Sequence, residues 1–458
     1  MRTTLDPHEL LDQESRLRKA NLGVSRQFPG AGGERQPVHT VYGGAHLFRA
    51  ETPAKLGALA LRTLEVYAPD AAALAEAMGM PGEVAERVRE RVMEKLRREP
   101  VEDYRIDFED GYGHRPGAEE DADAERAARE VARAAAEGTL PPFVGIRVKP
   151  LDEELRWRAV RTLDVFLTAL LDATGGALPP GLRVTLPKVT AAEQVDFLGD
   201  VLETLEMRMA LGTRSLRFEI MVEDPRALVA PDGRMALPEL VRAGGGRITG
   251  AHFGAYDYTA AIGVTAAHQH LRHPACDFAR QVMLASLAGT GVALSDGATT
   301  AMPIPPHRSG ADGAPLSEAQ RAENRATVHR AWRTHHDDVR HSLASGFYQG
   351  WDLHPAQLVT RYAAVFAFFL EGMEPAAARL RNFVERAAQA TRVGDAFDDA
   401  ATGQGLLNFF LRAVQSGALP EDEASARTGL TPEELRGRSF ARIVEARGAA
   451  EPGAAGDG

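Results

Sequence analysis

Eight short segments rich in β-branched and aromatic residues recur along the chain, and helix-like stretches occupy most of the gaps between them. They lie near residues 38–42, 104–109, 143–149, 182–189, 216–222, 248–254, 292–296 and 350–354. Strands that alternate with helices form parallel sheets, and eight such units can close into a barrel. The sequence therefore predicts an α/β protein, a (β/α)8 TIM barrel with a helical C-terminal extension.

The length of the chain indicates segments beyond the barrel. With 458 residues it is much longer than one typical barrel of about 250 residues. A capping box at Thr431-Pro-Glu-Glu marks one helix start near the C-terminus. We expect a polar N-terminal arm, the barrel, the helical extension and a small, Gly-rich disordered tail, at residues 1–36, 37–371, 372–447 and 448–458.

Charge and cysteine usage narrow the class of protein. A formal net charge of −11 argues against a general nucleic-acid binder, because affinity for phosphates needs a basic face. The single cysteine, Cys276, excludes an internal disulfide and fits a reducing compartment. The N-terminus lacks the apolar core of a signal peptide, and the longest apolar run, Ala363–Leu370, is too short to cross a bilayer. We therefore expect a cytoplasmic protein with neither membrane nor nucleic acid as a partner.

Charged and apolar residues alternate along several of the predicted strands. Arg105, Asp107 and Glu109 share one face of the second segment, and the third and fifth alternate in the same way. If the apolar rows pack on helices, the charged rows, including Asp352 of the eighth segment, point into the barrel, where unpaired charges are costly. A polar, ion-paired or metal-filled lumen is the expectation. A half-solvated antiparallel sheet would give the same alternation, but the helical gaps argue against it.

Six motifs in a fixed order carry a resemblance to a known family. They are Ile106-Asp-Phe-Glu-Asp-Gly, Ile146-Arg-Val, Leu186-Pro-Lys-Val, Ile220-Met-Val-Glu, Gly254-Ala-Tyr-Asp-Tyr and Leu353-His-Pro-Ala-Gln. Together they resemble the citrate lyase β-subunit and HpcH/HpaI aldolase family, of the phosphoenolpyruvate/pyruvate-type barrel superfamily. In that family these motifs end the strands of a barrel that binds Mg²⁺ and a 2-oxo acid or its enolate. The resemblance spans roughly Val38 to Tyr362.

The resemblance assigns roles at the strand ends, position by position. Glu223 and Asp257 match the two carboxylates that hold Mg²⁺, with Mn²⁺ as the alternative ion, and oxygen ligands suit such hard cations. Arg147 matches the arginine that contacts the substrate, although an ion pair with Asp107 or Glu109 would explain it equally well. Glu109 and Asp110 match the acidic pair beside the metal, and we place both with Arg147 in the catalytic set.

Four further residues complete the candidate site. Lys188 is interpreted as a supporting charge at the substrate rather than a Schiff-base lysine, because the resemblance is to metal-dependent enzymes. Gly254, which opens the motif of Asp257, is assigned to substrate binding. Asp296 ends the seventh strand and is a second inward candidate for that role. His354 is the fourth catalytic candidate, because it could pair with Asp352 or relay a proton.

The remaining histidine clusters are interpreted as structural, with neither a catalytic nor a metal-binding role. His335 and His336 lie in a polar helical stretch with His329 and His341, and a solvated helix explains that spacing. His268, His270 and His273 are expected in a loop, with no metal.

The predicted function is Mg²⁺-dependent carbon–carbon bond cleavage or formation through a metal-stabilised enolate of a 2-oxo acid or acyl-CoA-derived substrate. The departure from the family at Tyr42-Gly-Gly-Ala-His-Leu-Phe and the long insertion after it leave coenzyme A open as a substrate carrier. Alternatives are a phosphoenolpyruvate- or pyruvate-handling enzyme and a non-catalytic barrel that senses a metabolite. We also expect a homo-oligomer in which the Asp398-Asp399 region could cover a neighbouring site.

Overall fold

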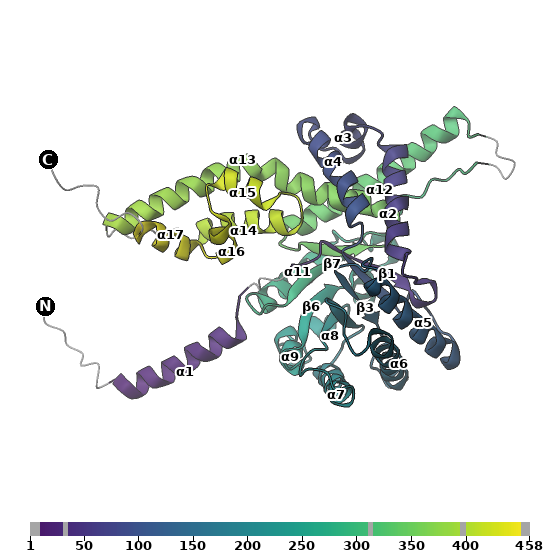
Figure 1. The fold of residues 1–458 in the computed structure, drawn as a ribbon, viewed down its shortest axis with the longest axis horizontal. Coiled ribbons are helices and arrows are strands. Elements are labelled where there is room, and N and C mark those ends of the chain that lie inside the picture. Colours follow the sequence, from purple (N-terminus) through teal and green to yellow (C-terminus); the bar gives the residue numbers. More distant parts are fainter. Residues whose placement is uncertain (1–9, 31–34, 310–314, 394–399, 450–458) are drawn as a thin grey trace.

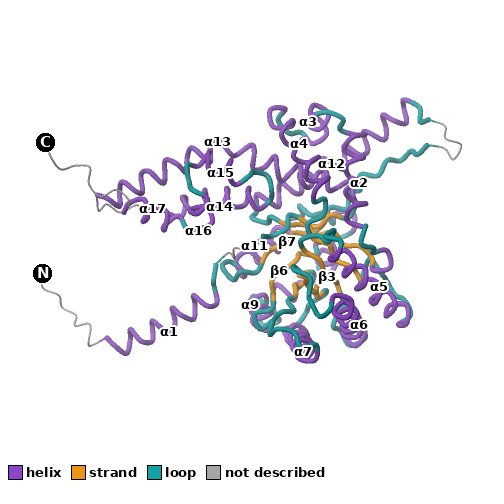
Figure 2. Tube along the Cα trace, in the orientation of Figure 1, coloured by secondary structure: helices purple, strands orange, loops and turns teal. Residues whose placement is uncertain are grey.

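A closed barrel of eight parallel strands forms the centre of the protein (Figures 1 and 2). The computed structural model describes residues 10–30, 35–309, 315–393 and 400–449. Each strand pairs with the next in chain order, and β8 closes the ring against β1. The strands are β1 (His39–Gly44), β2 (Asp103–Asp107), β3 (Phe143–Arg147), β4 (Leu182–Leu186), β5 (Phe218–Val222), β6 (Ile248–Phe253), β7 (Ala293–Ala298) and β8 (Gln349–Asp352). The predicted (β/α)8 fold is confirmed.

Helices occupy every connection between strands. They are α2 (Thr52–Tyr67), α3 (Ala71–Met78), α4 (Gly82–Arg98), α5 (Gly117–Ala136), α6 (Arg156–Thr174), α7 (Ala192–Arg208), α8 (Pro225–Leu228), α9 (Leu237–Ala243), α10 (Ala255–Ala261), α11 (Pro274–Leu287) and α12 (Glu318–Ala344). In α4, Val88, Val92 and Leu96 recur every fourth residue and are buried, because this spacing places them on one face. Two single 3-10 turns, η2 (Ala45–Leu47) and η3 (Ala266–His268), accompany them.

The alternation along β2, β3 and β5 sorts side chains between two environments. Ile106, Ile146 and Ile220 are buried in the hydrophobic core between the strands and the helices. The intervening polar side chains form ion pairs inside the ring: Arg105 pairs with Glu219 of β5, and Arg147 pairs with Asp107 of the neighbouring strand β2. The expected polar, ion-paired lumen is therefore present.

A single long helix, α13 (Pro355–Val393), joins the barrel to the C-terminal helices. Its first half packs on the barrel, where the Tyr362 hydroxyl donates to the Pro100 carbonyl oxygen over 3.0 Å. Farther along, Phe369 packs on Phe409 at 5.2 Å between ring centroids. The expected boundary between residues 371 and 372 thus falls inside one continuous helix.

Four shorter helices complete the C-terminal extension, which projects from the barrel in Figure 1. They are α14 (Ala400–Gln415), α15 (Glu421–Thr428), α16 (Pro432–Gly437) and α17 (Phe440–Ala449). The predicted capping box is present, since Thr431 Oγ1 accepts from the Glu434 amide and the Glu434 carboxylate accepts from the Thr431 amide. The Asp398-Asp399 region and residues 450–458 of the predicted tail lie outside the described residues.

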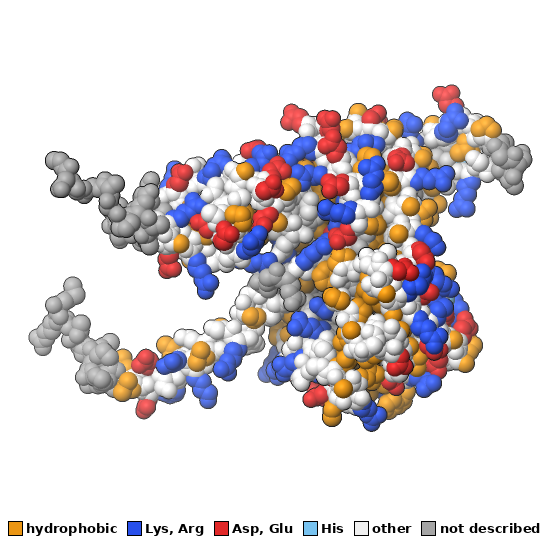
Figure 3. Space-filling view, viewed as in Figure 1, with side chains coloured by type: hydrophobic (Ala, Val, Ile, Leu, Met, Phe, Trp, Pro, Cys, Tyr) orange, Lys and Arg blue, Asp and Glu red, His pale blue; other side chains and the backbone are white. Residues whose placement is uncertain are grey.

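The N-terminal arm contains one helix, α1 (Leu11–Gln27), which buries none of its residues. In Figure 3 apolar and charged side chains alternate along α1, which stands away from the barrel. Arg35 and Gln36 instead contact the barrel, where Arg35 pairs with Glu102 at 2.8 Å and Gln36 donates to the Leu294 carbonyl oxygen. Within the described residues, none of the helices has the length and apolarity that crossing a bilayer would require.

Candidate active site

Six of the candidate residues gather at the C-terminal ends of β2 to β6: Glu109, Asp110, Arg147, Lys188, Glu223 and Asp257. In parallel barrels this end carries the loops that build active sites. Asp107 ends β2 and accepts hydrogen bonds from the amides of Glu109 and Gly111, at 3.0 and 2.7 Å. These bonds hold the tight turn that presents Glu109 and Asp110 to the barrel mouth. The local sequence thus fixes the direction of both carboxylates.

Lys188 lies at the centre of this group. Its ammonium is 3.1 Å from Glu109 Oε1, 3.4 Å from Asp257 Oδ1 and 3.6 Å from Asp110 Oδ2. Its backbone amide donates to Glu223 Oε1 over 2.5 Å. Lys188 has a φ of +50°, a left-handed conformation that costs free energy in a residue with a side chain. This backbone turns both the amide and the ammonium of one residue toward carboxylates.

Arg147 is held mainly by the barrel itself. Its Nε and Nη2 donate to the two carboxylate oxygens of Asp107 over 2.7 and 2.5 Å, which is bidentate pairing. Its Nη1 is 3.1 Å from Glu109 Oε2 and 3.7 Å from the Met221 sulfur. The expected ion pair with Asp107 and Glu109 is therefore present, and Nη1 is the nitrogen that a substrate oxygen could share with Glu109.

We name the six residues Glu109, Asp110, Arg147, Lys188, Glu223 and Asp257, together with Asp107, the upper layer of the lumen. The described ion pairs of its carboxylates go to two cations, Arg147 and Lys188. Five carboxylates against two cations leave excess negative charge. Burial above all raises the pKa of Glu223 to about 8, and the charge of Asp257 adds to this shift, although Lys188 and Arg147 oppose it.

Two other carboxyl groups of the upper layer show opposite shifts. Burial, opposed by Arg147 and Lys188 and helped by Asp110, raises the pKa of Glu109 above its ordinary value. Burial would also raise the pKa of Asp107, but the charge and hydrogen bonds of Arg147 outweigh it and lower that pKa. Asp107 is therefore the permanent counter-ion of Arg147, and Glu109 is the carboxyl group nearer to exchanging a proton.

The chemistry of the donors decides whether this end of the barrel suits Mg²⁺. Glu223 accepts from the Lys188 backbone amide and Asp257 pairs with the Lys188 ammonium, so both offer carboxylate oxygens beside one residue, and hard oxygen donors that leave room for water suit Mg²⁺. A Cβ on Gly254 would lie 2.5 Å from Glu223 Cβ and 2.7 Å from Oε2, so only glycine lets β6 pass this close. Among the described residues, no three acidic, histidine or cysteine side chains surround a common metal position. The carboxylates of Glu223 and Asp257 are thus of the chemical type that Mg²⁺ prefers, and they would supply two protein ligands.

A second charged group, which we name the lower layer, fills the lumen toward the N-terminal ends of the strands. Arg105 pairs with Asp103 and, at 2.6 Å, with Glu219, and Glu219 also contacts His252 Nε2 at 2.9 Å. The Trp351 indole nitrogen donates to His252 Nδ1 over 3.3 Å. An indole nitrogen only donates, so Nδ1 accepts and Nε2 carries the proton toward Glu219.

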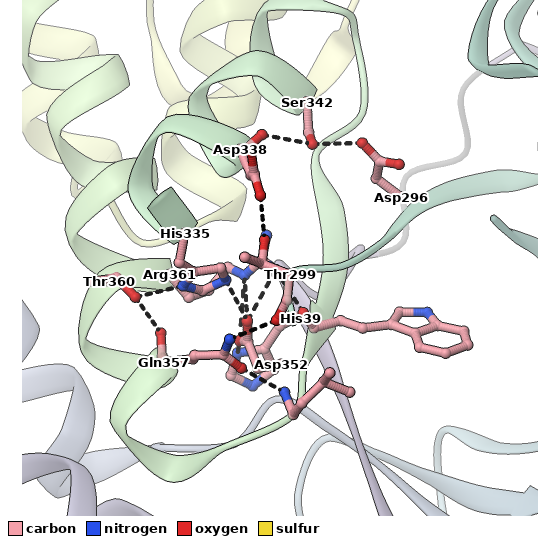
Figure 4. Close-up of polar contacts among 12 residues, drawn as sticks. His39, Asp296, Thr299, His335, Asp338, Ser342, Asp352, Gln357, Thr360 and Arg361 are labelled. Atoms are coloured by element: carbon pink, nitrogen blue, oxygen red, sulfur yellow. Dashed lines mark hydrogen bonds and ion pairs between the residues drawn. The ribbon is translucent and has the colours of Figure 1, made fainter. Parts of the chain in front are cut away.

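Asp352 does not point into the barrel, and that expectation is wrong. It is 1% exposed and pairs with His39 at 3.0 Å, with His335 of α12 at 3.1 Å and with Arg361 of α13 at 3.0 Å (Figure 4). Trp351 takes the inward position on β8. On β8 the charged residue therefore faces outward and the aromatic residue faces the lumen. Asp352 can face outward because two histidines and an arginine pair with its carboxylate outside the ring.

Asp296 also lies outside the lumen, so the prediction that it points inward is wrong. Its carboxylate accepts from Arg280 Nη1 at 3.1 Å and from the Ser342 hydroxyl, and Figure 4 shows the Ser342 contact. His354 does not pair with Asp352 in any described contact. Its Nδ1 accepts from the Ala356 amide over 3.2 Å at the start of α13, and burial lowers its pKa.

The histidine cluster of α12 is buried, which corrects the interpretation of a solvated helix. His335 is 1% and His336 6% exposed. His335 Nδ1 meets Thr360 Oγ1 at 2.5 Å, and its other nitrogen faces Asp352. The long α13 covers this face of α12, which the helical period alone did not indicate.

Two aromatic residues of the lumen were missed. Tyr42 and Trp351 pack against each other with tilted rings, 4.5 Å between centroids, and the Arg147 guanidinium lies 4.8 Å from the centre of the Tyr42 ring. A usable signal was present in the alternation of His39 and Val41 with Thr40 and Tyr42, which places Tyr42 on the face opposite Val41.

The chain matches one protein family and resembles solved structures of barrel proteins. Residues 17–443 match the family model described as "Domain of unknown function (DUF6986)". No curated protein sequence matches the chain. A citrate lyase structure from Burkholderia xenovorans LB400 is similar at 17% identity and a TM-score of 0.53, over 87% of this chain and 97% of that one.

A malate synthase structure from Haloferax volcanii is similar at 15% identity and a TM-score of 0.45, over 92% of this chain and 99% of that one. An HpcH/HpaI aldolase structure from Desulfitobacterium hafniense has 12% identity and a TM-score of 0.34, over 75% of this chain and 93% of that one. The citrate lyase is of a class to which the strand-end motifs pointed. At this identity the citrate lyase likeness shows the fold.

Proposed function

The chain belongs to the family described as a domain of unknown function (DUF6986), and from that premise we propose that it is a Mg²⁺-dependent carbon–carbon lyase or aldolase. Its substrate is a 2-oxo acid or an acyl-CoA-derived compound. The observation that carries the proposal is the convergence of Glu109, Asp110, Glu223 and Asp257, from three strand ends, on Lys188. Under-neutralised carboxylates at the C-terminal end of a barrel suit a divalent cation and an anionic substrate.

Glu223 and Asp257 are the residues that hold Mg²⁺ in this proposal. When bound, the ion supplies positive charge where electron density gathers on the substrate's carbonyl oxygen, which is worth several kcal/mol. Gly254 keeps space beside Glu223. Asp257, at 49% side-chain exposure, meets the solvent from which ion and substrate arrive.

The two cations of the upper layer orient the substrate. Lys188 has 36% of its side chain exposed, so its ammonium can exchange a carboxylate partner for a substrate oxygen. Arg147 cannot turn away from Asp107 without losing a bidentate pair, and it offers Nη1 from a fixed position. Held in this way, an extended substrate would bind with its scissile bond at a defined orientation, which lowers the entropic cost of reaction.

Glu109 suits the proton transfer. It lies between Arg147 and Lys188, and its pKa, which burial raises, favours a carboxylate that accepts and returns a proton. In the cleavage direction Glu109 accepts the proton of the substrate hydroxyl as the carbon–carbon bond breaks. The electron pair of that bond passes into the adjacent carbonyl group as an enolate, and the enolate carbon then takes the proton back.

The test is a binding and turnover experiment on the full chain. Pyruvate, oxaloacetate, phosphoenolpyruvate and acetyl-CoA are titrated with and without Mg²⁺ by calorimetry, and substrate loss is followed. We expect Mg²⁺-dependent binding of a 2-oxo acid, and Glu223→Gln and Asp257→Asn to weaken Mg²⁺ binding about tenfold or more. Asp232→Asn, at an exposed loop position with 57% side-chain exposure, is the matched control.

Each contrary outcome points to one alternative. Mg²⁺ binding that survives both substitutions means that the ligands are wrong. Tight binding of phosphoenolpyruvate alone favours a phosphoenolpyruvate-handling enzyme, and binding of a 2-oxo acid without turnover favours a metabolite sensor. Binding of acetyl-CoA decides whether coenzyme A is the carrier.

A further inference from the structure

Two aromatic rings separate the charged layers of the lumen. Arg147 lies 4.8 Å from the Tyr42 ring and 6.0 Å from the Trp351 ring, so the upper layer rests on their faces. Below them, Trp351 donates to His252 of the lower layer. The sulfur of Met221, 3.7 Å from Arg147, adds a third soft, weakly polar surface at this level.

Solvent contacts these rings, while most of the charged groups beneath them are buried. Tyr42 and Trp351 are partly exposed, whereas Thr40, Asp103 and Arg105 of the lower layer are fully buried. A substrate that enters at the C-terminal mouth, past the upper layer, would meet the rings before the lower layer. We name the partly exposed surface of the two rings the aromatic floor.

The aromatic floor and the charges above it favour one kind of substrate group. The Trp351 indole N–H already donates to His252, and the Tyr42 hydroxyl is buried, so the exposed ring faces can pack on a methyl or short alkyl group and carry no cation for a second carboxylate. In the described ion pairs, Arg147 and Lys188 already serve four carboxylates, those of Asp107, Glu109, Asp110 and Asp257. A second substrate carboxylate would meet net negative charge, which disfavours a dianion.

Resting on the proposed function, we infer that Tyr42 and Trp351 determine specificity and restrict the substrate to monocarboxylic 2-oxo acids with a short apolar side chain. Branched or longer side chains meet the rings. Dicarboxylic 2-oxo acids lack a cation for their second group.

Three 2-oxo acids distinguish the effect of side-chain length from the effect of a second carboxylate. Pyruvate, 2-oxovalerate and 2-oxoglutarate are titrated by calorimetry into the Mg²⁺-loaded protein. The first two differ in chain length, and the last two differ by one carboxylate. We expect each step to weaken binding about tenfold or more, because two methylenes that do not fit, or an unpaired charge, cost at least that much. Trp351→Leu should shrink the pyruvate preference over 2-oxovalerate about fivefold and leave the discrimination against 2-oxoglutarate unchanged.

The matched control is Trp157→Leu, at a tryptophan of α6 that is 65% exposed. It should leave both ratios unchanged. An unchanged length ratio in Trp351→Leu overturns the aromatic floor, and equal binding of 2-oxovalerate and 2-oxoglutarate overturns the charge argument. If no acid binds with Mg²⁺, the proposed function fails as well, so the two failures are distinguishable.

Fluorescence gives a second measurement if Trp351→Leu does not fold. Pyruvate should change the tryptophan emission of the parent and of Trp157→Phe, but not of Trp351→Phe, while calorimetry still detects binding to all three. An emission change that persists in Trp351→Phe overturns the inference, because the reporting ring then lies elsewhere.

Discussion

The upper and lower layers of the lumen both combine carboxylates with an arginine, and they differ in how completely their charges are paired. In the lower layer Arg105 lies between Asp103 and Glu219, and His252 meets Glu219 on one nitrogen and Trp351 on the other. In the upper layer Lys188 is shared by three carboxylates. The lower layer is closed and structural, and the upper layer is open to an added cation.

The difference follows from solvent access. Arg105 and Asp103 are completely buried, so any unpaired charge there would cost several kcal/mol and each group has its partner. Asp110 and Asp257 expose 59% and 49% of their side chains, and water screens their excess charge. A barrel can therefore keep unpaired carboxylates only at its mouth.

The largest expected effect is on the lower layer. Arg105→Leu should lower the free energy of unfolding by about 3–5 kcal/mol, because it leaves Asp103 and Glu219 buried without their shared cation. Chemical denaturation measures the change. Arg129→Leu, at an arginine of α5 with 66% side-chain exposure, should cost less than about 1 kcal/mol. Equal losses in the two variants would show that the lower layer is not a closed unit.

The next effect has the opposite sign and lies in the upper layer. The pKa of Glu223 is raised from 4.5 to about 8, so the folded state holds this proton more tightly than the unfolded state. The free energy of unfolding of the metal-free protein therefore falls as pH rises from about 4.5 to 8. Glu223→Gln removes that loss and should stabilise the protein on the order of 2 kcal/mol at pH 9, with little gain at pH 4.5.

Denaturation in the presence of a chelator measures this difference. Glu219→Gln of the lower layer is the comparison, and it should destabilise at both pH values because it weakens the pairing of Arg105. A Glu223→Gln protein that is less stable than the parent at pH 9 would contradict the view that the upper layer is short of positive charge.

The smallest expected effect concerns the backbone of Lys188. With φ at +50°, Lys188→Gly should be more stable than Lys188→Ala by about 1 kcal/mol, because both lose the ammonium but only alanine keeps the strained conformation. In an ordinary helix the order is reversed. If alanine is the more stable variant, the left-handed turn that aims the Lys188 amide at Glu223 is not a strained feature.

The strand-end positions of the candidate site could be predicted because each depends on nearby residues. The turn after β2 follows from Asp107, which accepts the amides of Glu109 and Gly111 two and four residues on. Asp296 and Asp352 could not be placed in this way. Their partners Arg280 and Arg361 come from helices α11 and α13. The alternation of residues along a strand does not indicate that a helix outside the barrel supplies an arginine to pair with an outward-facing carboxylate.

By itself the sequence determined the number and order of the strands, the apolar rows under the helices and the motifs that place acidic residues at one end of the barrel. These depend on side-chain period and on turns a few residues long, which are local properties. Only the tertiary structure decided that Lys188 gathers four carboxylates, that Asp107 holds Arg147 and that Tyr42 and Trp351 lie beneath it. Closing the ring brings together residues far apart in the chain, and the balance of charge and water at each depth depends on that closure.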